Sequence, residues 1–311
     1  MRSLFASLVA LLFGVSAASC SVRDASESSA AACTNGRDDD RDGHVDCDDQ
    51  DCDAFCGGGG TDAAVPMGDA GGGGGNRDAA GGCFSPIDLV FVLDVSTSMS
   101  EEFARLRDGI GSIFAAADAL TPDHRFGLVV FVDDVLVVNG CASFDSAAAL
   151  QSEFDRWRSF CSTNGNPGGA SADNSDCPEN SLDALYAAAT QCTWRPGATH
   201  IVIHATDDTF REAPARFTFS VQAQHSYAEV SSALTTSQIR VGAFAQLVPM
   251  ECGAGTSADT ATGFFGQYDA QASLPDATGG RVWDIAQVRN GTLDMATAIN
   301  EMIVAEHCAP F

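Results

Sequence analysis

Hydrophobic and amphipathic stretches alternate along the chain from residue 83 onward. Residues 87–93 are apolar except for Asp88, which is typical of a strand buried on both faces of a parallel sheet. Residues 101–120 have helical spacing, with four apolar side chains on one side: Phe103, Leu106, Ile110 and Ile113. Similar patterns predict strands at 126–132, 135–138, 200–205, 240–247 and 280–285, and helices at 144–157, 181–192 and 293–305. This alternation predicts an α/β fold with a doubly wound, mostly parallel sheet flanked by helices, whose ligand site lies at the carboxyl ends of the strands.

The first 19 residues have the pattern of an export signal peptide. Arg2 gives a positive start, and residues 4–15 form an apolar run too short to span a bilayer as a mature helix. The small residues before Cys20 resemble a bacterial lipobox, although Ala17 stands where Leu is usual. The resemblance implies a lipidated Cys20 and an exported lipoprotein anchored in the outer membrane. Ordinary cleavage near Ala17 or Ala18, giving a secreted or periplasmic protein, is the alternative.

Composition divides the rest of the chain into four segments. Residues 20–32 form a tether, 33–56 an acidic Cys-rich module, 57–82 a Gly/Ala/Asp linker with almost nothing to bury, and 83–311 the main domain. The linker is expected to be disordered. The chain carries 42 acidic and 16 basic residues, a formal charge of −26. Such a charge repels nucleic acid and favours cations, so we expect no nucleic-acid binding and membrane contact only through the lipid anchor.

Twelve cysteines in an exported chain indicate disulfide bonds. Without Cys20 their number is odd, so one cysteine remains unpaired. Cys83 and Cys308 flank the main domain and are candidates for a bridge that joins its two ends. The other pairings are left open by the sequence.

Asp94, Ser96 and Ser98 occupy alternate positions directly after the first predicted strand. One carboxylate and two hydroxyls in such a turn are hard oxygen ligands suited to Mg²⁺, Mn²⁺ or Ca²⁺. This DxSxS sequence, between a buried strand and a helix, resembles the metal-ion-dependent adhesion site of von Willebrand factor A domains. The alternative is a serine-rich helix cap, with Ser98 or Ser100 as the capping residue.

Two further segments extend the resemblance. The predicted strand at 200–205 is followed by Thr206-Asp207-Asp208, and family members carry a metal-contacting Asp at the position of Asp207. Asp208 stands where Gly is usual, and an ordinary acidic turn is the alternative. The intervening loop has no convincing Thr ligand but contains Asn174-Ser175-Asp176-Cys177-Pro178-Glu179, which resembles the integrin β-subunit version of the domain.

The integrin-like resemblance implies a cluster of cation sites. The central site would hold Mg²⁺ or Mn²⁺ through Asp94, Ser96, Ser98, Glu179 and Asp207. An adjacent site would hold Ca²⁺ through Asp133, Asn174, Asp176, the Pro178 carbonyl and Glu179. A third cation would lie beside Glu101 and Glu102, although an acidic helix start favoured by the helix dipole explains these two residues equally well.

The acidic module at 33–56 is a separate calcium candidate. Its acids have the spacing of EF-hand and thrombospondin type 3 loops, with Gly43 at the sharp turn: Asp38, Asp40, Asp42, Asp46 and Asp49. The absence of flanking amphipathic helices favours the thrombospondin-like form. A disordered acidic spacer is the alternative.

These features predict a binding module of the cell envelope rather than an enzyme. We find no Gly-x-Ser-x-Gly, HExxH, phosphate-loop or dinucleotide-binding motif, and His200 and His204 are expected to be core residues. The expected partner is a protein that offers an acidic side chain to the central cation. The alternative is a structural or assembly component of the envelope whose cations only stabilise the fold.

Overall fold

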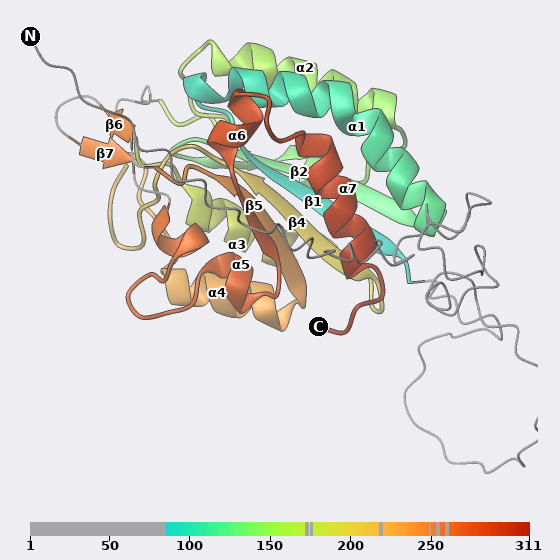
Figure 1. The fold of residues 1–311 in the computed structure, drawn as a ribbon. Helices are drawn as coiled ribbons and strands as arrows, with labels where there is room; N and C mark the ends of the chain where they lie inside the picture. The colour runs from blue at the N-terminus through green and yellow to red at the C-terminus, as the bar shows by residue number, and fades with distance from the viewer. Residues whose placement is uncertain are drawn as a thin grey trace, which may run out of the picture. The chain divides into compact units, whose positions relative to one another are not determined.

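The computed structural model describes residues 85–171, 174, 177–217, 220–248, 250–252, 256–258 and 261–311. A six-stranded sheet forms the centre of this part of the chain, with the strand order β3-β2-β1-β4-β5-β8 (Figure 1). Its strands are β1 (Ile87–Asp94), β2 (His124–Phe131), β3 (Val135–Val137), β4 (Thr199–Ala205), β5 (Ile239–Ala245) and β8 (Arg281–Asp284). The short strands β6 (Met250–Cys252) and β7 (Thr256–Ala258) pair with each other outside this sheet.

The sheet is parallel except at one edge. β1 pairs in parallel with β2 on one side and with β4 on the other. β5 pairs in parallel with β4, and β8 pairs in parallel with β5. In this sheet only β3 runs antiparallel to its neighbour, β2. The chain moves outward from β1 to β2 and then returns to place β4 on the opposite side of β1. The carboxyl ends of β1 and β4 therefore flank the point where the strand order reverses, which is where α/β sheets of this kind bind ligands.

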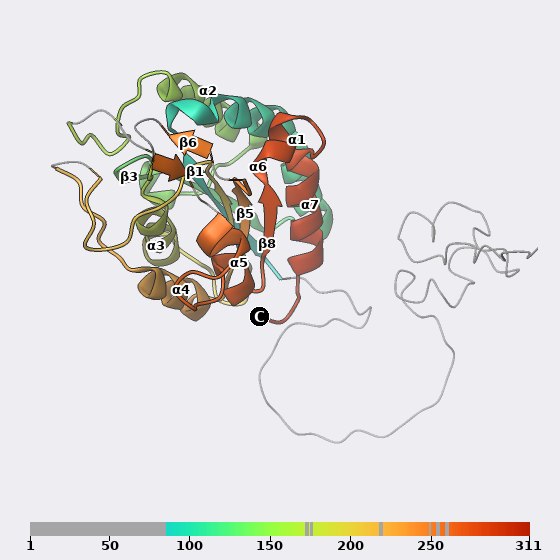
Figure 2. The ribbon, with the colours of Figure 1, turned by 60° about the vertical axis from the view of Figure 1, so that its left-hand side comes forward.

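Helices cover both faces of the sheet, as Figures 1 and 2 show. One face carries α1, α2 and α7, and the other carries α3, α4 and α5. The predicted fold class, a doubly wound and mostly parallel α/β sheet flanked by helices, is confirmed. The helices are α1 (Ser100–Leu120), α2 (Ala147–Cys161), α3 (Ser181–Gln191), α4 (Tyr227–Thr236), α5 (Leu274–Ala277), α6 (Ile285–Arg289) and α7 (Met295–Glu306), with short turns η4 (Thr97–Met99), η5 (Val138–Cys141) and η6 (Ala261–Phe265).

The central strand β1 is buried along its whole length because it faces a hydrophobic core on each side. Side chains alternate between the faces of a strand. Leu89, Phe91 and Leu93 therefore enter the core beneath α1, α2 and α7. Val90 and Val92 enter the core beneath α3, α4 and α5. This two-sided packing holds the carboxyl end of β1, and thus Asp94, in a fixed position.

Two helices depart from the elements that the sequence predicts, and both begin at a capping serine. The predicted helix at 144–157 begins later, at Ala147, because the Ser146 side chain accepts the N–H of Ala149 and caps it there. Helix α4 was not predicted, although Ser226 and Glu229 form a reciprocal capping box at its start. Within the described residues, no helix is both long and apolar enough to cross a bilayer.

One disulfide bond joins two distant segments of the described domain. Cys141, at the end of η5, is bonded to Cys192, which follows α3. Cys177 and Cys308 each take part in a disulfide bond as well. Cys83, the partner expected for Cys308, lies outside the described residues. Cys161 is buried and free, which identifies a candidate for the unpaired cysteine that the odd count requires.

Candidate metal centre

The turn after β1 forms the first part of the site. Asp94 is fully buried, and its Oδ1 accepts the backbone N–H of Ser96 at 2.7 Å. The Oγ atoms of Ser96 and Ser98 lie 3.1 Å apart, so both hydroxyls face the same space. Thr97 and Ser98 are exposed, whereas Asp94 and Ser96 are buried. The turn therefore presents one solvent-accessible oxygen ligand above two buried ones.

The turn after β4 completes an acidic cluster with the turn after β1. Asp207 is buried, and its Oδ1 accepts the Ser98 hydroxyl at 2.8 Å. Thr206 donates its hydroxyl to Asp94 Oδ2 at 2.8 Å. Asp94, Asp207 and Asp208 each offer a carboxylate oxygen, and these oxygens lie within 4.8 Å of one another. Asp208 was not predicted as a ligand, because the family resemblance places Gly at that position.

Glu179 reaches the same cluster from the loop before α3. Its backbone N–H donates to the Thr209 carbonyl at 2.7 Å, which ties this loop to the segment after β4. The side chain is fully buried, and Oε1 accepts the Asn174 amide at 2.6 Å. Oε2 is buried with no hydrogen-bond partner among the described residues. Burial raises the pKa of Glu179 well above its ordinary value, and the charges of Asp94, Asp208 and Asp133 add to the shift.

The electrostatics of the cluster favour a bound cation. Burial and, as the second cause, the charge of Asp207 together raise the pKa of Asp94 from 3.8 to about 7. Buried carboxylates that repel one another in this way are unfavourable unless a positive charge compensates them. The oxygen donors, the unpartnered Glu179 Oε2 and the mutual repulsion all fit a divalent cation bound by hard ligands.

The predicted adjacent site is partly described. Asp133 is fully buried after β2, and its charge contributes to the shifted pKa of Glu179, so the two carboxylates are neighbours. Asn174 contacts Glu179 through its amide nitrogen, and its Oδ1 is buried with no hydrogen-bond partner among the described residues. Pro178 precedes Glu179 in the same loop. Asp176 lies outside the described residues.

The structure does not support the predicted third cation site. Glu101 is exposed, while Glu102 is buried and paired with Arg289, whose Nε lies 2.5 Å from Glu102 Oε1. Arg289 Nη2 lies 2.9 Å from Asp207 Oδ2. The guanidinium thus occupies the space between Glu102 and the central cluster. Sequence reasoning missed Arg289 because it lies about 80 residues beyond the last predicted ligand, with no motif around it.

Besides Cys83 and Asp176, several further predicted residues lie outside the described residues. They are the lipidation candidate Cys20 and the five acids of the N-terminal calcium loop: Asp38, Asp40, Asp42, Asp46 and Asp49.

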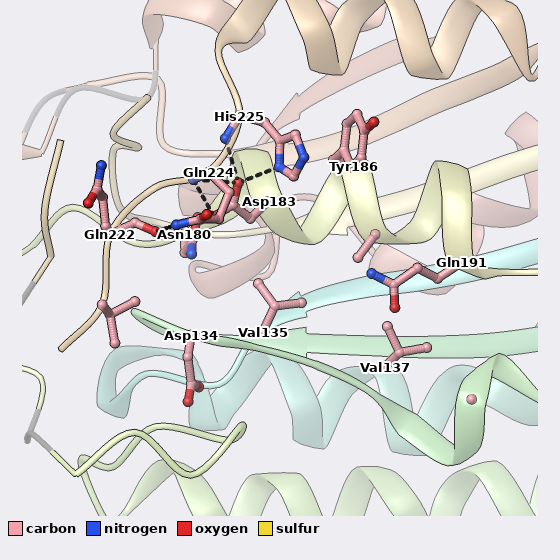
Figure 3. A pocket seen from close by; sticks show the side chains of 13 residues that line it. Asp134, Val135, Val137, Asn180, Asp183, Tyr186, Gln191, Gln222, Gln224 and His225 are labelled. Atoms are coloured by element: carbon pink, nitrogen blue, oxygen red, sulfur yellow. Dashed lines mark hydrogen bonds and ion pairs between the residues drawn. The ribbon is translucent and has the colours of Figure 1, made fainter. Parts of the chain in front are cut away.

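A pocket of about 620 Å³ lies beside the metal centre, between β3 and α3 (Figure 3). On its wall, Asp183 accepts the backbone N–H groups of Gln224 and His225, and its Oδ1 lies 2.7 Å from His225 Nδ1. Asp134 and Asn180 also line the pocket; they directly follow Asp133 and Glu179 in the chain. The predicted central ligands are not part of the lining, so the pocket is a neighbour of the metal centre rather than the metal centre itself.

Comparisons with known proteins give a partial similarity. No family model matches the chain. Integrin beta-4 from Homo sapiens is 29% identical over 146 residues, which cover 40% of this chain and 8% of that protein. Integrin beta-4 from Mus musculus is 27% identical over 147 residues, with the same coverages.

Two solved structures match weakly and at low sequence identity. Proximal thread matrix protein 1 from the mussel byssus has a TM-score of 0.42 and 16% identity, covering 74% of this chain and 48% of that chain. An aerotolerance-related membrane protein from Bacteroides fragilis NCTC 9343 has a TM-score of 0.42 and 14% identity, covering 70% and 99%. The sequence similarity to integrin beta-4, over 40% of the chain, agrees with the integrin-like pattern of the acidic loops and hints at a domain of the von Willebrand factor A type.

Proposed function

We propose that residues 83–311 form a von Willebrand factor A-type binding domain that recognises an acidic group of a partner protein through a divalent cation. Asp94, Ser96, Ser98, Glu179 and Asp207 would hold Mg²⁺ or Mn²⁺, and a partner carboxylate would complete the coordination. The observation that carries the proposal is the buried, unpartnered Glu179 Oε2 within a cluster of mutually repelling carboxylates. A divalent cation would compensate the carboxylate charges that Arg289, which pairs with Asp207 and Glu102, leaves unbalanced.

Access to the cation supports a binding role. Ser98 is exposed and contacts both Ser96 and the buried Asp207, so a cation bound by these residues would lie close to the surface. Asp208 belongs to the same acidic cluster and would either join the coordination or hold a bound water. The similarity to integrin beta-4 supports the same class of domain.

The rest of the chain would place this domain at the cell envelope. We propose that Cys20 carries a lipid anchor and that residues 57–82 act as a flexible spacer. As a flexible coil, a spacer of 26 residues has a root-mean-square length of roughly 25–30 Å. Ca²⁺ would occupy the adjacent site and the acidic loop at 33–56.

The test of this function is whether a carboxylate binds the protein-held cation. Full-length protein would be saturated with Mn²⁺, and the relaxation of acetate methyl protons would be measured by NMR, with Asp94→Asn as the control for free and loosely held Mn²⁺. The proposal predicts enhanced relaxation that requires Asp94. Mn²⁺ binding without an Asp94-dependent effect on acetate would contradict it and would favour a cation that only stabilises the fold.

Replacing Glu179 with Thr is expected to weaken Ca²⁺ binding while preserving Mg²⁺ binding. Threonine keeps one oxygen for the central cation but removes the carboxylate that both predicted sites share. With loss of one charged ligand, we expect Ca²⁺ affinity to fall roughly tenfold, equivalent to about 1.4 kcal/mol. Calorimetric titration of the full-length variant with each cation checks this. Glu301→Thr, at an exposed position on α7, is a suitable control. Unchanged affinity for both cations would show that Glu179 is not a shared ligand.

A further inference from the structure

The Arg289 side chain lies against the candidate metal centre and contacts three residues there, Glu102, Asp207 and Ser98. Its side chain is 25% exposed; Nε lies 2.5 Å from Glu102 Oε1, and Nη2 lies 2.9 Å from Asp207 Oδ2. Nη2 also lies 3.4 Å from the Ser98 carbonyl oxygen. The backbone carbonyl of Arg289 accepts a hydrogen bond from Arg105 at 3.0 Å. Helix α6, which ends at Arg289, lies beside α1 in both ribbon views (Figures 1 and 2).

Both partners of Arg289 are buried acids with different positions relative to the predicted cation. Asp207 belongs to the carboxylate cluster and shares its other oxygen with the Ser98 hydroxyl. Glu102 lies one residue beyond Glu101 in the first turn of α1, and burial raises its pKa while the Arg289 charge opposes that shift. Arg289 therefore bridges a ligand-bearing turn to a carboxylate outside the cluster, through ion pairs that do not depend on a metal.

A fixed positive charge at this position acts in opposite directions on the two binding steps. It repels a divalent cation that approaches Asp94, Asp207 and Glu179, and so lowers the affinity for the cation. Once the cation is bound, the same charge offsets one of the surrounding carboxylates and strengthens the attraction for an anionic ligand. Charged side chains that are partly buried are poorly screened, so this influence persists at physiological salt.

We propose that Arg289 is a built-in cation that sets the balance between metal affinity and acidic-ligand affinity at the central site, in the space where the sequence predicted a third bound metal. The inference rests on the proposed function, because it assumes that the central site binds both a cation and a carboxylate. It assigns Arg289 a positioning and electrostatic role rather than a direct contact with the metal.

The test compares variants in which either the positive or the negative member of the Arg289–Glu102 ion pair loses its charge. Arg289→Gln removes the positive charge and is expected to raise Mn²⁺ affinity and lower acetate affinity, each roughly threefold to tenfold. Glu102→Gln removes a negative charge and is expected to shift both affinities the other way. Arg289→Lys keeps the charge but loses the planar guanidinium that reaches both acids, so both affinities should lie between those of the parent protein and those of Arg289→Gln. Mn²⁺ binding is followed by calorimetry and acetate binding by NMR relaxation, on full-length protein.

A control variant separates electrostatic effects from loss of structure. Arg240 pairs with the Glu306 carboxylate at 2.8 Å, and Arg240→Gln should lower thermal stability without changing either affinity. If Arg289→Gln does not fold, Glu102→Gln still gives the predicted signs, and Arg289→Lys tests the same direction of change as Arg289→Gln on a smaller scale. Shifts in the same direction for Arg289→Gln and Glu102→Gln, or no shift, would overturn the inference while leaving the proposed function intact. A parent protein that binds no Mn²⁺ would overturn both.

Discussion

Replacing Asp94 with Asn is expected to stabilise the metal-free protein by about 3 kcal/mol at pH 8. The pKa of Asp94 is raised from 3.8 to about 7 by burial and by the charge of Asp207, so ionising this carboxyl in the folded state is unfavourable. A shift of this size corresponds to about 4 kcal/mol, from which roughly 1 kcal/mol is subtracted for the weakened hydrogen bond from Thr206. Chemical denaturation in the presence of a chelator measures the change.

The sign of this effect depends on pH and on the cation. The destabilisation by ionised Asp94 is present above pH 7 and disappears as the pH falls toward 4, where the folded state binds the proton. The advantage of Asp94→Asn should therefore vanish at pH 4. With Mg²⁺ at about a hundred times its dissociation constant, the parent protein should gain about 2.7 kcal/mol that the variant does not gain.

Asp88 provides a matched control on the same strand. It is also buried, but it lies at the opposite end of β1 and its Oδ1 pairs with Arg195 at 2.7 Å. Asp88→Asn should destabilise the protein with or without metal, because it leaves the Arg195 charge without its buried partner. If both variants destabilise the metal-free protein at pH 8, Asp94 is not under electrostatic strain and the proposed cation cluster loses its main physical support.

Replacing His204 with Phe is expected to remove about 2 kcal/mol of acid-induced destabilisation between pH 7 and pH 5. His204 is fully buried on β4, and its ring stacks between Phe131 and Phe264 at centroid distances of 5.5 and 5.0 Å. Burial lowers the pKa of His204 from 6.5 to about 3. As the pH falls below 6.5, the unfolded chain binds a proton that the folded state rejects, so stability is lost progressively toward pH 3.

The measurement is the difference in unfolding free energy between the parent protein and His204→Phe, at pH 7 and pH 5, with chelator present. Taking the difference cancels the opposite pH dependence of the carboxylate cluster. The control is His200→Phe, which also replaces a histidine of β4. The ring of His200 is half-buried rather than fully buried, and its nitrogens lie 2.8 and 2.9 Å from the carbonyl oxygens of Ser237 and Arg195. A difference that stays constant with pH would show that His204 is protonated in the folded protein.

Local sequence patterns predicted the elements that form the sheet and most of the helices. The apolar run before Asp94 predicts β1 because a strand packed on both faces needs no polar side. The DxSxS turn, Asp207 and Glu179 were proposed as ligands from the resemblance to von Willebrand factor A domains and their integrin β version, whose motifs they match beside a predicted strand or helix. Helix α4 was missed even though Ser226 and Glu229 carry its capping signal, because the segment before it has no clear periodicity.

The remaining features of the site depend on contacts between distant segments. Arg289 meets Glu102 and Asp207 only when α6 packs beside α1, and a single Arg in a five-residue helix carries no local signal of that contact. Asp208 joins the acidic cluster through the path of the chain after β4, which the spacing of residues does not reveal. Hydrophobic patterning could therefore locate the edge of the sheet that bears the site but not the charges that regulate it.

Equilibrium Mn²⁺ binding to the full-length parent protein, Asp94→Asn and Asp88→Asn tests the central claim most directly. The cation cluster predicts that Asp94→Asn binds one Mn²⁺ fewer than the parent, because the acidic module at 33–56 and the adjacent site are unchanged. Folded Asp88→Asn should bind the same number as the parent, since Asp88 lies at the other end of β1. An equal number of Mn²⁺ ions bound by Asp94→Asn and the parent would contradict a metal centre at the carboxyl ends of β1 and β4.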